Sequence, residues 1–391
     1  MLRIFRVSGL FIIMKIAIDI SQIVYPSTGV ATFTMELVKQ ILQKDKDNQY
    51  LIFGMALSQM DRLNDFYNIC KRINNNVVKK FIPLPEKLSN FLFNKIRYPD
   101  LFKFTNQVDI YHSSDWIQLP ADCRKITTIH DLVIKKYPEL SDPYIVNTHE
   151  KRLQWVKKEC DLVVADSIST KKDIIKYISI HENKIEVVYP GINDIFIPCD
   201  HQEISRVKNR YGLLDDYILS VGTIEPRKNL KRTVEAFGQF MHHQLISSLG
   251  KPVELIIIGK TGWGNDIKPI KGTRILGMVE SIDLPAIYSG AKMFVYPSLY
   301  EGFGLPVIEA FSCGCPVITS DRGSLEEISG GASQLVDPDN SEDIAVKMVK
   351  VFIDKSLRND LISKGIKQAN NFSWEKTADG YISSYQKIFK Q

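Results

Sequence analysis

The amino-acid sequence predicts an α/β protein with two doubly wound domains, each built on a parallel sheet. The chain has 391 residues and is 44% hydrophobic, which is enough for two cores. Short runs rich in Val, Ile and aromatic residues alternate with longer amphipathic segments, as in parallel sheets covered by helices. The alternation starts again after residue 216. Ligands in such sheets bind beyond the carboxyl ends of the strands, so we expect a site between the two domains.

The candidate strands of the first half span 15–20, 50–55, 77–82, 108–112, 125–130, 161–165 and 185–189. Those of the second half span 217–221, 253–258, 274–277, 293–296 and 316–319, with a helix at 229–240. Prolines and charged residues between the halves predict a connection. We divide the chain into an N-terminal extension (1–13), a first domain (14–195), a linker (196–215), a second domain (216–372) and a final helix (373–391).

Composition limits the function. The formal charge is +5 and the pI is about 8.6, a smaller excess than is typical of nucleic-acid-binding proteins. The six cysteines show neither C-x-x-C pairs nor zinc-site spacing, so we expect reduced thiols in the cytoplasm. Residues 1–13 contain only a short apolar run without a small-residue cleavage site. No segment approaches the ~20 apolar residues that span a bilayer.

A glycine-rich turn follows the candidate strand at 293–296. Residues Glu301 to Glu309 read E-G-F-G-L-P-V-I-E, in which Pro306 suits the start of a helix. Glycines let the backbone approach a ligand, and a helix start favours a phosphate. Because carboxylates repel phosphate, we expect Glu301 and Glu309 to bind sugar or ribose hydroxyls, with Glu309 in the first helical turn. The alternative is that Glu309 only complements the helix dipole and Glu301 is a loop carboxylate.

A basic loop follows the first strand of the second half. Residues Gly222 to Asn229 read G-T-I-E-P-R-K-N. Arg227 and Lys228 stand at a helix start that is already positive, so two cations there need an anionic partner. We expect them to neutralise a leaving diphosphate.

These two motifs resemble the E-x7-E motif and the basic loop of the retaining glycosyltransferases of family GT4, which have the GT-B fold of two Rossmann-like domains facing a cleft. The resemblance runs from about Met14 to the C-terminus. It includes Phe372 to Ala378, which is similar to the start of the final family helix that crosses back onto the first domain. The resemblance implies a metal-independent hexosyltransferase without a cofactor, with a nucleotide-diphosphate sugar as its donor.

By this resemblance, Glu309 holds the donor ribose, Glu301 contacts the transferred sugar, and Arg227 and Lys228 bind the diphosphate. The backbone amides after Glu301 line the sugar and phosphates, and the loop at 277–280 lies along the nucleobase. The donor-binding residues are Gly29, Gly222, Thr223, Arg227, Lys228, Met278, Val279, Glu301, Gly302, Phe303, Gly304, Leu305 and Glu309. The catalytic residues are His130, Asp131, Arg227, Lys228 and Glu301.

The first domain contributes two segments. Thr128 to Leu132, T-I-H-D-L, resembles the T-x-H-D segment of the mannosyltransferase-like branch, in which the histidine lies beside the transferred sugar. Asp131 orients His130 or the acceptor hydroxyl, or else caps a helix. Residues 27–30, S-T-G-V, resemble the glycine loop of the family with Thr28 in place of one glycine, so Gly29 is either a donor contact or a turn residue.

Two D-x-D segments, Asp45-Lys46-Asp47 and Asp337-Pro338-Asp339, match the pattern of metal-dependent transferases. We interpret both as polar turns and predict no metal, because Arg227 and Lys228 already supply positive charge.

Residues 84–104 mix aromatic and basic side chains. This composition is compatible with a peripheral contact with the inner face of the cell membrane. Pro85 and Pro99 interrupt a long helix, and a partly buried helix with snorkelling lysines is the alternative.

The branch resemblance favours mannose transfer from GDP-mannose to a lipid-linked or oligosaccharide acceptor in cell-surface polysaccharide synthesis. UDP-glucose, UDP-N-acetylglucosamine and GDP-fucose stay open as donors. A nucleotide-sugar epimerase and a non-catalytic nucleotide-sugar binding protein also stay open as functions. A dehydrogenase is disfavoured because no G-x-G-x-x-G follows the first strand.

Overall fold

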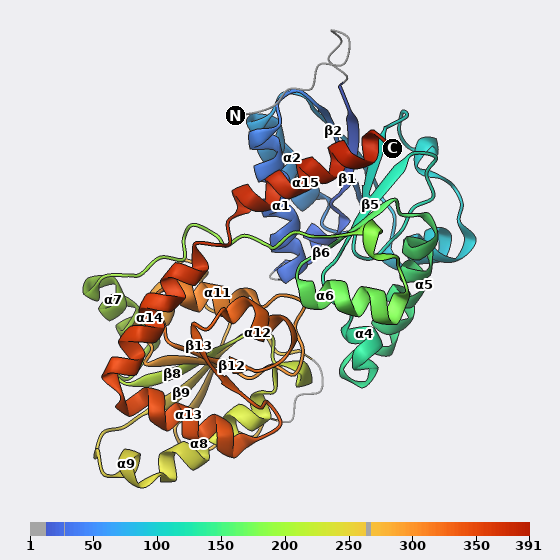
Figure 1. Cartoon of the computed structure of the whole chain (residues 1–391). Helices are drawn as coiled ribbons and strands as arrows, with labels where there is room; N and C mark the ends of the chain where they lie inside the picture. The colour runs from blue at the N-terminus through green and yellow to red at the C-terminus, as the bar shows by residue number, and fades with distance from the viewer. Residues whose placement is uncertain (1–12, 27, 263–266) are drawn as a thin grey trace.

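The computed structural model describes residues 13–26, 28–262 and 267–391, which form two α/β domains (Figure 1). The first domain contains a seven-stranded sheet with the order β3-β2-β1-β4-β5-β6-β7. All its strand pairs are parallel. Its strands are β1 (Lys15–Asp19), β2 (Gln49–Met55), β3 (Val77–Ile82), β4 (Ile110–Ser113), β5 (Arg124–Ile129), β6 (Leu162–Ala165) and β7 (Ile185–Val187).

The second domain contains a six-stranded parallel sheet with the order β10-β9-β8-β11-β12-β13. Its strands are β8 (Tyr217–Val221), β9 (Glu254–Ile258), β10 (Thr273–Gly277), β11 (Met293–Tyr296), β12 (Val317–Ser320) and β13 (Ser333–Val336). In both sheets the strand order reverses direction beside the first strand, which is where doubly wound domains bind ligands.

Helices cover both faces of each sheet. Ile16 and Ile18 pack into one core and Ala17 into another, because successive side chains of a strand point to opposite faces. The same alternation separates Leu219 from Ile218 in the second sheet. The predicted class of two doubly wound α/β domains is therefore confirmed.

The helices of the first domain are α1 (Gly29–Lys44), α2 (Met60–Ile73), α3 (Glu86–Ser89), α4 (Val133–Lys136), α5 (Pro143–Glu159) and α6 (Ile168–Asp173). Those that follow are α7 (His201–Tyr211), α8 (Leu230–His242), α9 (Gln244–Ser247), α10 (Leu284–Gly290), α11 (Leu305–Ser312), α12 (Gly323–Ser329), α13 (Ser341–Ile353), α14 (Lys355–Ala369) and α15 (Trp374–Phe389). In the parts of the chain given above, no helix is both long and apolar enough to cross a membrane.

Two elements correct the sequence prediction. The predicted linker at 196–215 contains helix α7, which packs against α10. This helix buries only Val207 and carries arginines that pair with Asp283, so its sequence resembles a charged connection. Strand β13 was not predicted, because Ser333 and Gln334 give it a polar start at the edge of the sheet.

Helix α15 lies on the first domain after the chain has left α14 of the second (Figure 1). It packs against α1 and buries Trp374, Tyr381 and Tyr385. The Tyr381 and Tyr385 hydroxyls bond Thr128 Oγ1 at 2.7 Å and His112 Nδ1 at 2.8 Å. The last helix therefore braces the strand that ends beside His130.

Candidate active site at the domain interface

The carboxyl ends of the two sheets meet through the loop after β11. The hydroxyl of Tyr300, in this loop, accepts a hydrogen bond from the Leu132 backbone N–H at 3.1 Å. It donates to Asp173 Oδ2 at 2.9 Å. Both partners belong to the first domain, so the glycine-rich turn of the second domain is held directly against the end of β5.

Gly302 lies at a close approach between the domains. A Cβ atom at this position would lie 1.8 Å from the carbonyl oxygen of His130, which only glycine avoids. The Gly302 carbonyl accepts hydrogen bonds from the hydroxyls of Ser167 at 2.6 Å and Thr170 at 3.0 Å. The predicted donor turn and the predicted catalytic histidine are thus adjacent.

Glu301 is the centre of a buried charged group. Its Oε1 accepts hydrogen bonds from Lys228 Nζ at 2.7 Å, Tyr296 Oη at 2.8 Å and Ser298 Oγ at 2.7 Å. Its Oε2 pairs with Arg227 Nη1 at 2.6 Å. Burial alone would raise the pKa of Glu301, but Arg227 and Lys228 lower it to about 2. Glu301 therefore stays ionised, and its predicted contact with sugar hydroxyls stays a prediction.

Arg227 and Lys228 are placed by a short 3₁₀ turn, Pro226–Lys228. Arg227 also pairs with Glu225, at 2.8 Å between Nη2 and Oε1. Burial and the neighbouring Arg227 lower the pKa of Lys228. The two cations therefore flank one carboxylate, that of Glu301. Their predicted contact with a diphosphate stays a prediction.

Glu309 stands apart from this group. It is the fifth residue of α11, one position beyond the predicted first turn, because the helix begins at Leu305. Its Oε2 accepts a hydrogen bond from the Tyr288 hydroxyl at 3.0 Å. Burial raises the pKa of Glu309 to about 7, and the Tyr288 hydrogen bond only partly offsets this effect. Glu309 therefore titrates near neutral pH.

Five other predicted donor residues lie in the same two motifs. Gly304 has φ of 112° and Gly222 has φ of 151°, conformations that favour glycine. The Phe303 side chain packs between Tyr189 and Phe372, so only its backbone is left for a donor. Leu305 opens α11, and Thr223 follows Gly222 in the basic loop.

Met278 and Val279 follow β10, where Met278 is 58% exposed and Val279 packs against the core. Gly29 is the first residue of α1 and is exposed, after Thr28, whose hydroxyl accepts the Ala31 N–H. Ser27, and residues 1–12 of the predicted extension, lie outside the described residues.

His130 forms an ion pair that the sequence did not reveal. Its Nδ1 bonds Asp166 Oδ2 at 2.7 Å, and the Phe33 ring lies at 4.7 Å in a T-shaped contact. Burial disfavours the imidazolium, but the charge and hydrogen bond of Asp166 raise the pKa of His130 to about 9. Asp166 follows β6, which pairs with β5. A polar residue at the end of the neighbouring strand was the available signal.

Family models match most of the chain. "Glycosyltransferase Family 4" matches residues 27–195, and "Glycosyl transferases group 1" matches residues 201–368. The O-antigen chain mannosyltransferase B of Escherichia coli is 31% identical over 95% of this chain and 100% of its own length. The chain belongs to glycosyltransferase family 4. It is a glycosyltransferase of the mannosyltransferase-like group with the GT-B fold.

Other relatives of this family 4 glycosyltransferase match less of the chain or share only its fold. The serotype-specific mannosyltransferase WbdA of Escherichia coli is 27% identical, and the match covers 75% of this chain and 37% of WbdA. Sucrose-phosphate synthase from Thermosynechococcus elongatus has a TM-score of 0.73 at 18% identity, covering 96% of this chain and 99% of that one. HepE of Anabaena, in complex with UDP and glucose, has a TM-score of 0.69 at 15% identity over the same shares.

Asp131 of this glycosyltransferase has a local contact. Its Oδ1 accepts the Val133 backbone N–H at 3.0 Å, at the start of α4. The N-cap residue of α4 is Leu132, which makes no side-chain cap, so Asp131 makes a local turn contact just before the helix instead of the capping bond that the sequence left open. Its predicted catalytic role stays a prediction.

The two D-x-D segments make local contacts. Asp45 Oδ2 accepts hydrogen bonds from Asn48 and Tyr50 at 2.6 Å. Asp337 and Asp339 pair with Arg322 at 2.5 and 2.6 Å. Within the described ranges, no three His, Cys, Asp or Glu residues are grouped as a metal site. The described cysteines are all free.

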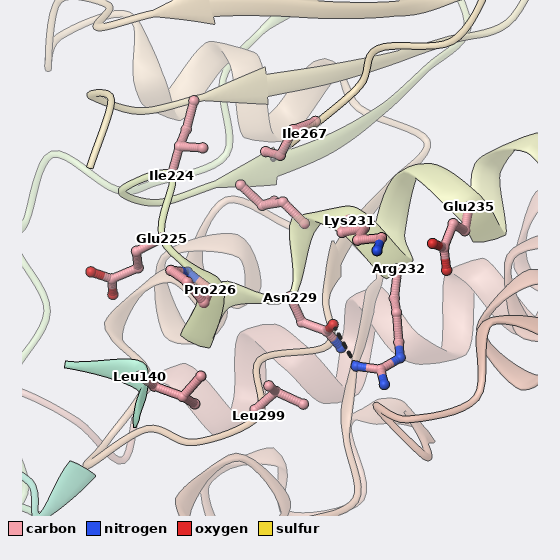
Figure 2. A pocket seen from close by; sticks show the side chains of 11 residues that line it. Leu140, Ile224, Glu225, Pro226, Asn229, Lys231, Arg232, Glu235, Ile267 and Leu299 are labelled. Carbon is pink, nitrogen blue, oxygen red and sulfur yellow. Dashed lines mark hydrogen bonds between the residues drawn. The ribbon is translucent and has the colours of Figure 1, made fainter. Parts of the chain in front are cut away.

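A cavity of about 400 Å³ lies beside the basic loop (Figure 2). Figure 2 shows Leu140, from the first domain, near Pro226 and Leu299 of the second. The residues that line it include Glu225 and Asn229 but none of the predicted donor-binding residues. This cavity therefore lies next to the predicted donor-binding residues and is not lined by them.

Proposed function

We propose that this glycosyltransferase moves mannose from GDP-mannose to a lipid-linked or oligosaccharide acceptor in cell-surface polysaccharide synthesis. The configuration of the donor is retained, and no metal or cofactor takes part. The observation that carries the proposal is the buried group of Arg227, Lys228 and Glu301, which lies next to His130 at the domain interface. The 31% identical relative named as an O-antigen chain mannosyltransferase supports the sugar and the pathway class.

In this mechanism the bond between the anomeric carbon and the diphosphate oxygen breaks. The acceptor oxygen forms the new bond on the same face, and its proton passes to the leaving diphosphate. Arg227 and Lys228 stabilise the charge that develops on the diphosphate. Because His130 Nδ1 donates its hydrogen bond to the Asp166 carboxylate, Nε2 is left to donate to a hydroxyl of the transferred sugar. Positioning and electrostatics supply the acceleration.

Glu309 binds the ribose hydroxyls in this proposal. The ionised carboxylate is an acceptor at both oxygens and forms stronger hydrogen bonds with hydroxyls than the protonated carboxyl, one oxygen of which is a donor. The Tyr288 hydroxyl already donates a hydrogen bond to Oε2, so Oε1 is the oxygen left to accept hydrogen bonds from the ligand. Since the pKa of Glu309 is raised to about 7, binding of the donor depends on pH in the neutral range.

A donor screen tests the proposal. Thermal shift and hydrolysis are measured with GDP-mannose, GDP-fucose, UDP-glucose and UDP-N-acetylglucosamine, with EDTA present. Wild type is compared with Glu309→Ala, and Glu326→Ala, an α12 residue, is the control. GDP-mannose is expected to stabilise the wild type and the control but not Glu309→Ala. Equal stabilisation of Glu309→Ala, or binding that requires a divalent metal, overturns the proposal.

A UDP-sugar-dependent transferase is the second candidate, favoured by the UDP and glucose bound to HepE, which shares the fold. The same screen identifies it through stabilisation by a UDP-sugar. Conversion of a nucleotide sugar without an acceptor identifies an epimerase, and binding without turnover on many acceptors identifies a binding protein.

We also place the enzyme in the cytoplasm, peripheral to the inner face of the cell membrane. Leu88, Phe91 and Ile96 are 44%, 47% and 51% exposed. They lie near Lys87 and Lys95 in the sequence, so an apolar and basic surface fits anionic lipid. Co-sedimentation with phosphatidylglycerol vesicles is expected for the wild type and reduced for Phe91→Asp. Equal sedimentation with neutral vesicles contradicts the contact.

A further inference from the structure

We propose that Tyr25, Glu86, Trp116 and His149 form a subsite for a sugar ring of the acceptor, beyond the sugar that receives the new bond. This inference rests on the proposed function, because it assigns the acceptor as a glycan of more than one residue. We name these residues the aromatic subsite.

The topology brings the aromatic subsite together from separate segments. Tyr25 follows β1, Glu86 begins α3 after β3, and Trp116 follows β4. His149 lies on α5, which comes after β5. The carboxyl ends of parallel strands share one edge of the sheet, and the edge of β5 carries His130. The subsite therefore lies on the edge that faces the reaction centre.

Direct contacts join these side chains. The Trp116 and His149 ring centroids are 4.9 Å apart, and those of Tyr25 and Trp116 are 6.5 Å apart. The Tyr25 hydroxyl donates to Glu86 Oε2, and the Tyr144 hydroxyl donates to Oε1 at 3.2 Å. Two tyrosine hydroxyls thus hold a carboxylate beside an indole ring.

The chemistry of this group suits a sugar. Tyr25 and Tyr144 are 38% and 39% exposed, and Trp116 and Glu86 are half-buried. Aromatic faces pack against the apolar C–H face of a pyranose, and a carboxylate accepts hydrogen bonds from its hydroxyls. Among the described residues, no cation pairs with Glu86, so its hydrogen bonds are neutral and leave room for ligand hydroxyls. A carbohydrate is therefore a better fit than an anionic ligand.

The aromatic subsite is connected to the reaction centre. Asp115, the neighbour of Trp116, pairs with Arg152 at 3.3 Å. Arg152 is fully buried and donates to the Thr128 carbonyl at 2.9 Å, two residues before His130. Asp115 and His130 also line one small cavity. The subsite thus begins one side chain away from the sugar position at His130, as expected for a second ring of the acceptor.

Calorimetric titration with linear α-mannotriose and with mannose tests this subsite. The wild type is expected to bind mannotriose more tightly than mannose. Trp116→Ala is expected to weaken mannotriose binding about tenfold, the effect of losing one well-packed aromatic contact. Trp116→Phe, which keeps an aromatic face, is expected to restore most of the affinity, and Glu86→Gln is expected to weaken it less than Trp116→Ala.

Val78→Ala is the control, because Val78 is an exposed apolar residue of the same domain, on the edge strand β3, outside both the subsite and the proposed membrane contact. It is expected to bind mannotriose as the wild type does, and GDP-mannose is expected to stabilise all the variants equally. Unchanged mannotriose binding by Trp116→Ala, equal binding of mannose and mannotriose, or no mannotriose binding by the wild type overturns the subsite. If GDP-mannose is not the donor, it does not stabilise the wild type. This result is separate from the mannotriose measurements.

Discussion

The two sides of the candidate site differ in how their charges are arranged. In the second domain, Glu301 accepts four hydrogen bonds from side chains and compensates Arg227 and Lys228 in a buried group. In the first domain, Glu86 is held by tyrosine hydroxyls beside exposed aromatic rings. A preorganised buried charge suits a leaving group that every donor shares. An open aromatic surface suits an acceptor that differs between enzymes.

Substitution of Arg227 is expected to have the largest effect on turnover. Arg227→Ala is expected to lower kcat by about 10²–10³-fold, because a cation that stabilises the leaving diphosphate is lost. Steady-state transfer measures this effect, with circular dichroism as a check on folding. The control is Arg322→Ala, which removes a cation whose ion-pair partners include Asp337 and Asp339 but not Glu301. Near-normal turnover of Arg227→Ala would remove the diphosphate role.

Asp166 tests whether the first domain also uses a preorganised charge. Asp166→Asn is expected to lower kcat by about 10–100-fold and to move the basic limb of the pH–rate profile from about pH 9 towards the ordinary histidine range. The raised pKa of His130 stabilises the fold below pH 6.5, and this contribution is lost as the pH rises through about 9. A pH–rate profile identical to that of the wild type contradicts the role of Asp166 as a positioning residue.

Glu309 sharpens the comparison within the second domain, since Glu301 stays ionised and Glu309 titrates. Donor affinity is expected to rise about tenfold between pH 6 and pH 8 as a group with a pKa of about 7 ionises. The stability of the fold changes with pH in the opposite sense to donor affinity. Its raised pKa gives stability below pH 4.5 that is lost as the pH rises through about 7. Calorimetry with GDP-mannose is expected to find a flat pH dependence for Glu309→Gln, and a persistent slope excludes Glu309 as its source.

Weakening the hydrogen-bonded contact between the two domains is expected to have the smallest effect on the kinetics. Ser167→Ala removes one of two hydroxyls that bond the Gly302 carbonyl. Because Thr170 remains, the loss is expected to be about 1 kcal/mol, seen as a roughly fivefold rise in KM for the donor. A change in kcat with no change in KM argues against this hydroxyl as a domain-closure contact.

The sequence pointed to more candidate residues in the second domain than in the first, for a physical reason. Glu301 and Glu309 occur in one continuous motif, and Arg227 and Lys228 occur in another. Because each motif follows a strand of the same parallel sheet, both were expected at one edge of that sheet, where the structure brings Arg227 and Lys228 onto Glu301. The alternation of apolar runs likewise predicted both sheets, but not the polar edge strand β13 or the charged helix α7.

Contacts between distant segments escaped prediction. Asp166 meets His130 only because β5 and β6 are neighbours. The proposed aromatic subsite takes single residues from separate loops and helices, which form no motif in the sequence. Tyr300 and Gly302 meet the first domain through tertiary packing that local sequence does not encode.

The most direct measurement is proton NMR of the product formed from GDP-α-mannose and α-mannotriose with EDTA present. The proposed mechanism predicts a new α-mannosyl anomeric signal in the wild type and little of it in Arg227→Ala. A β-mannosyl signal, or transfer that appears only after a divalent metal is added, would contradict retention without a metal.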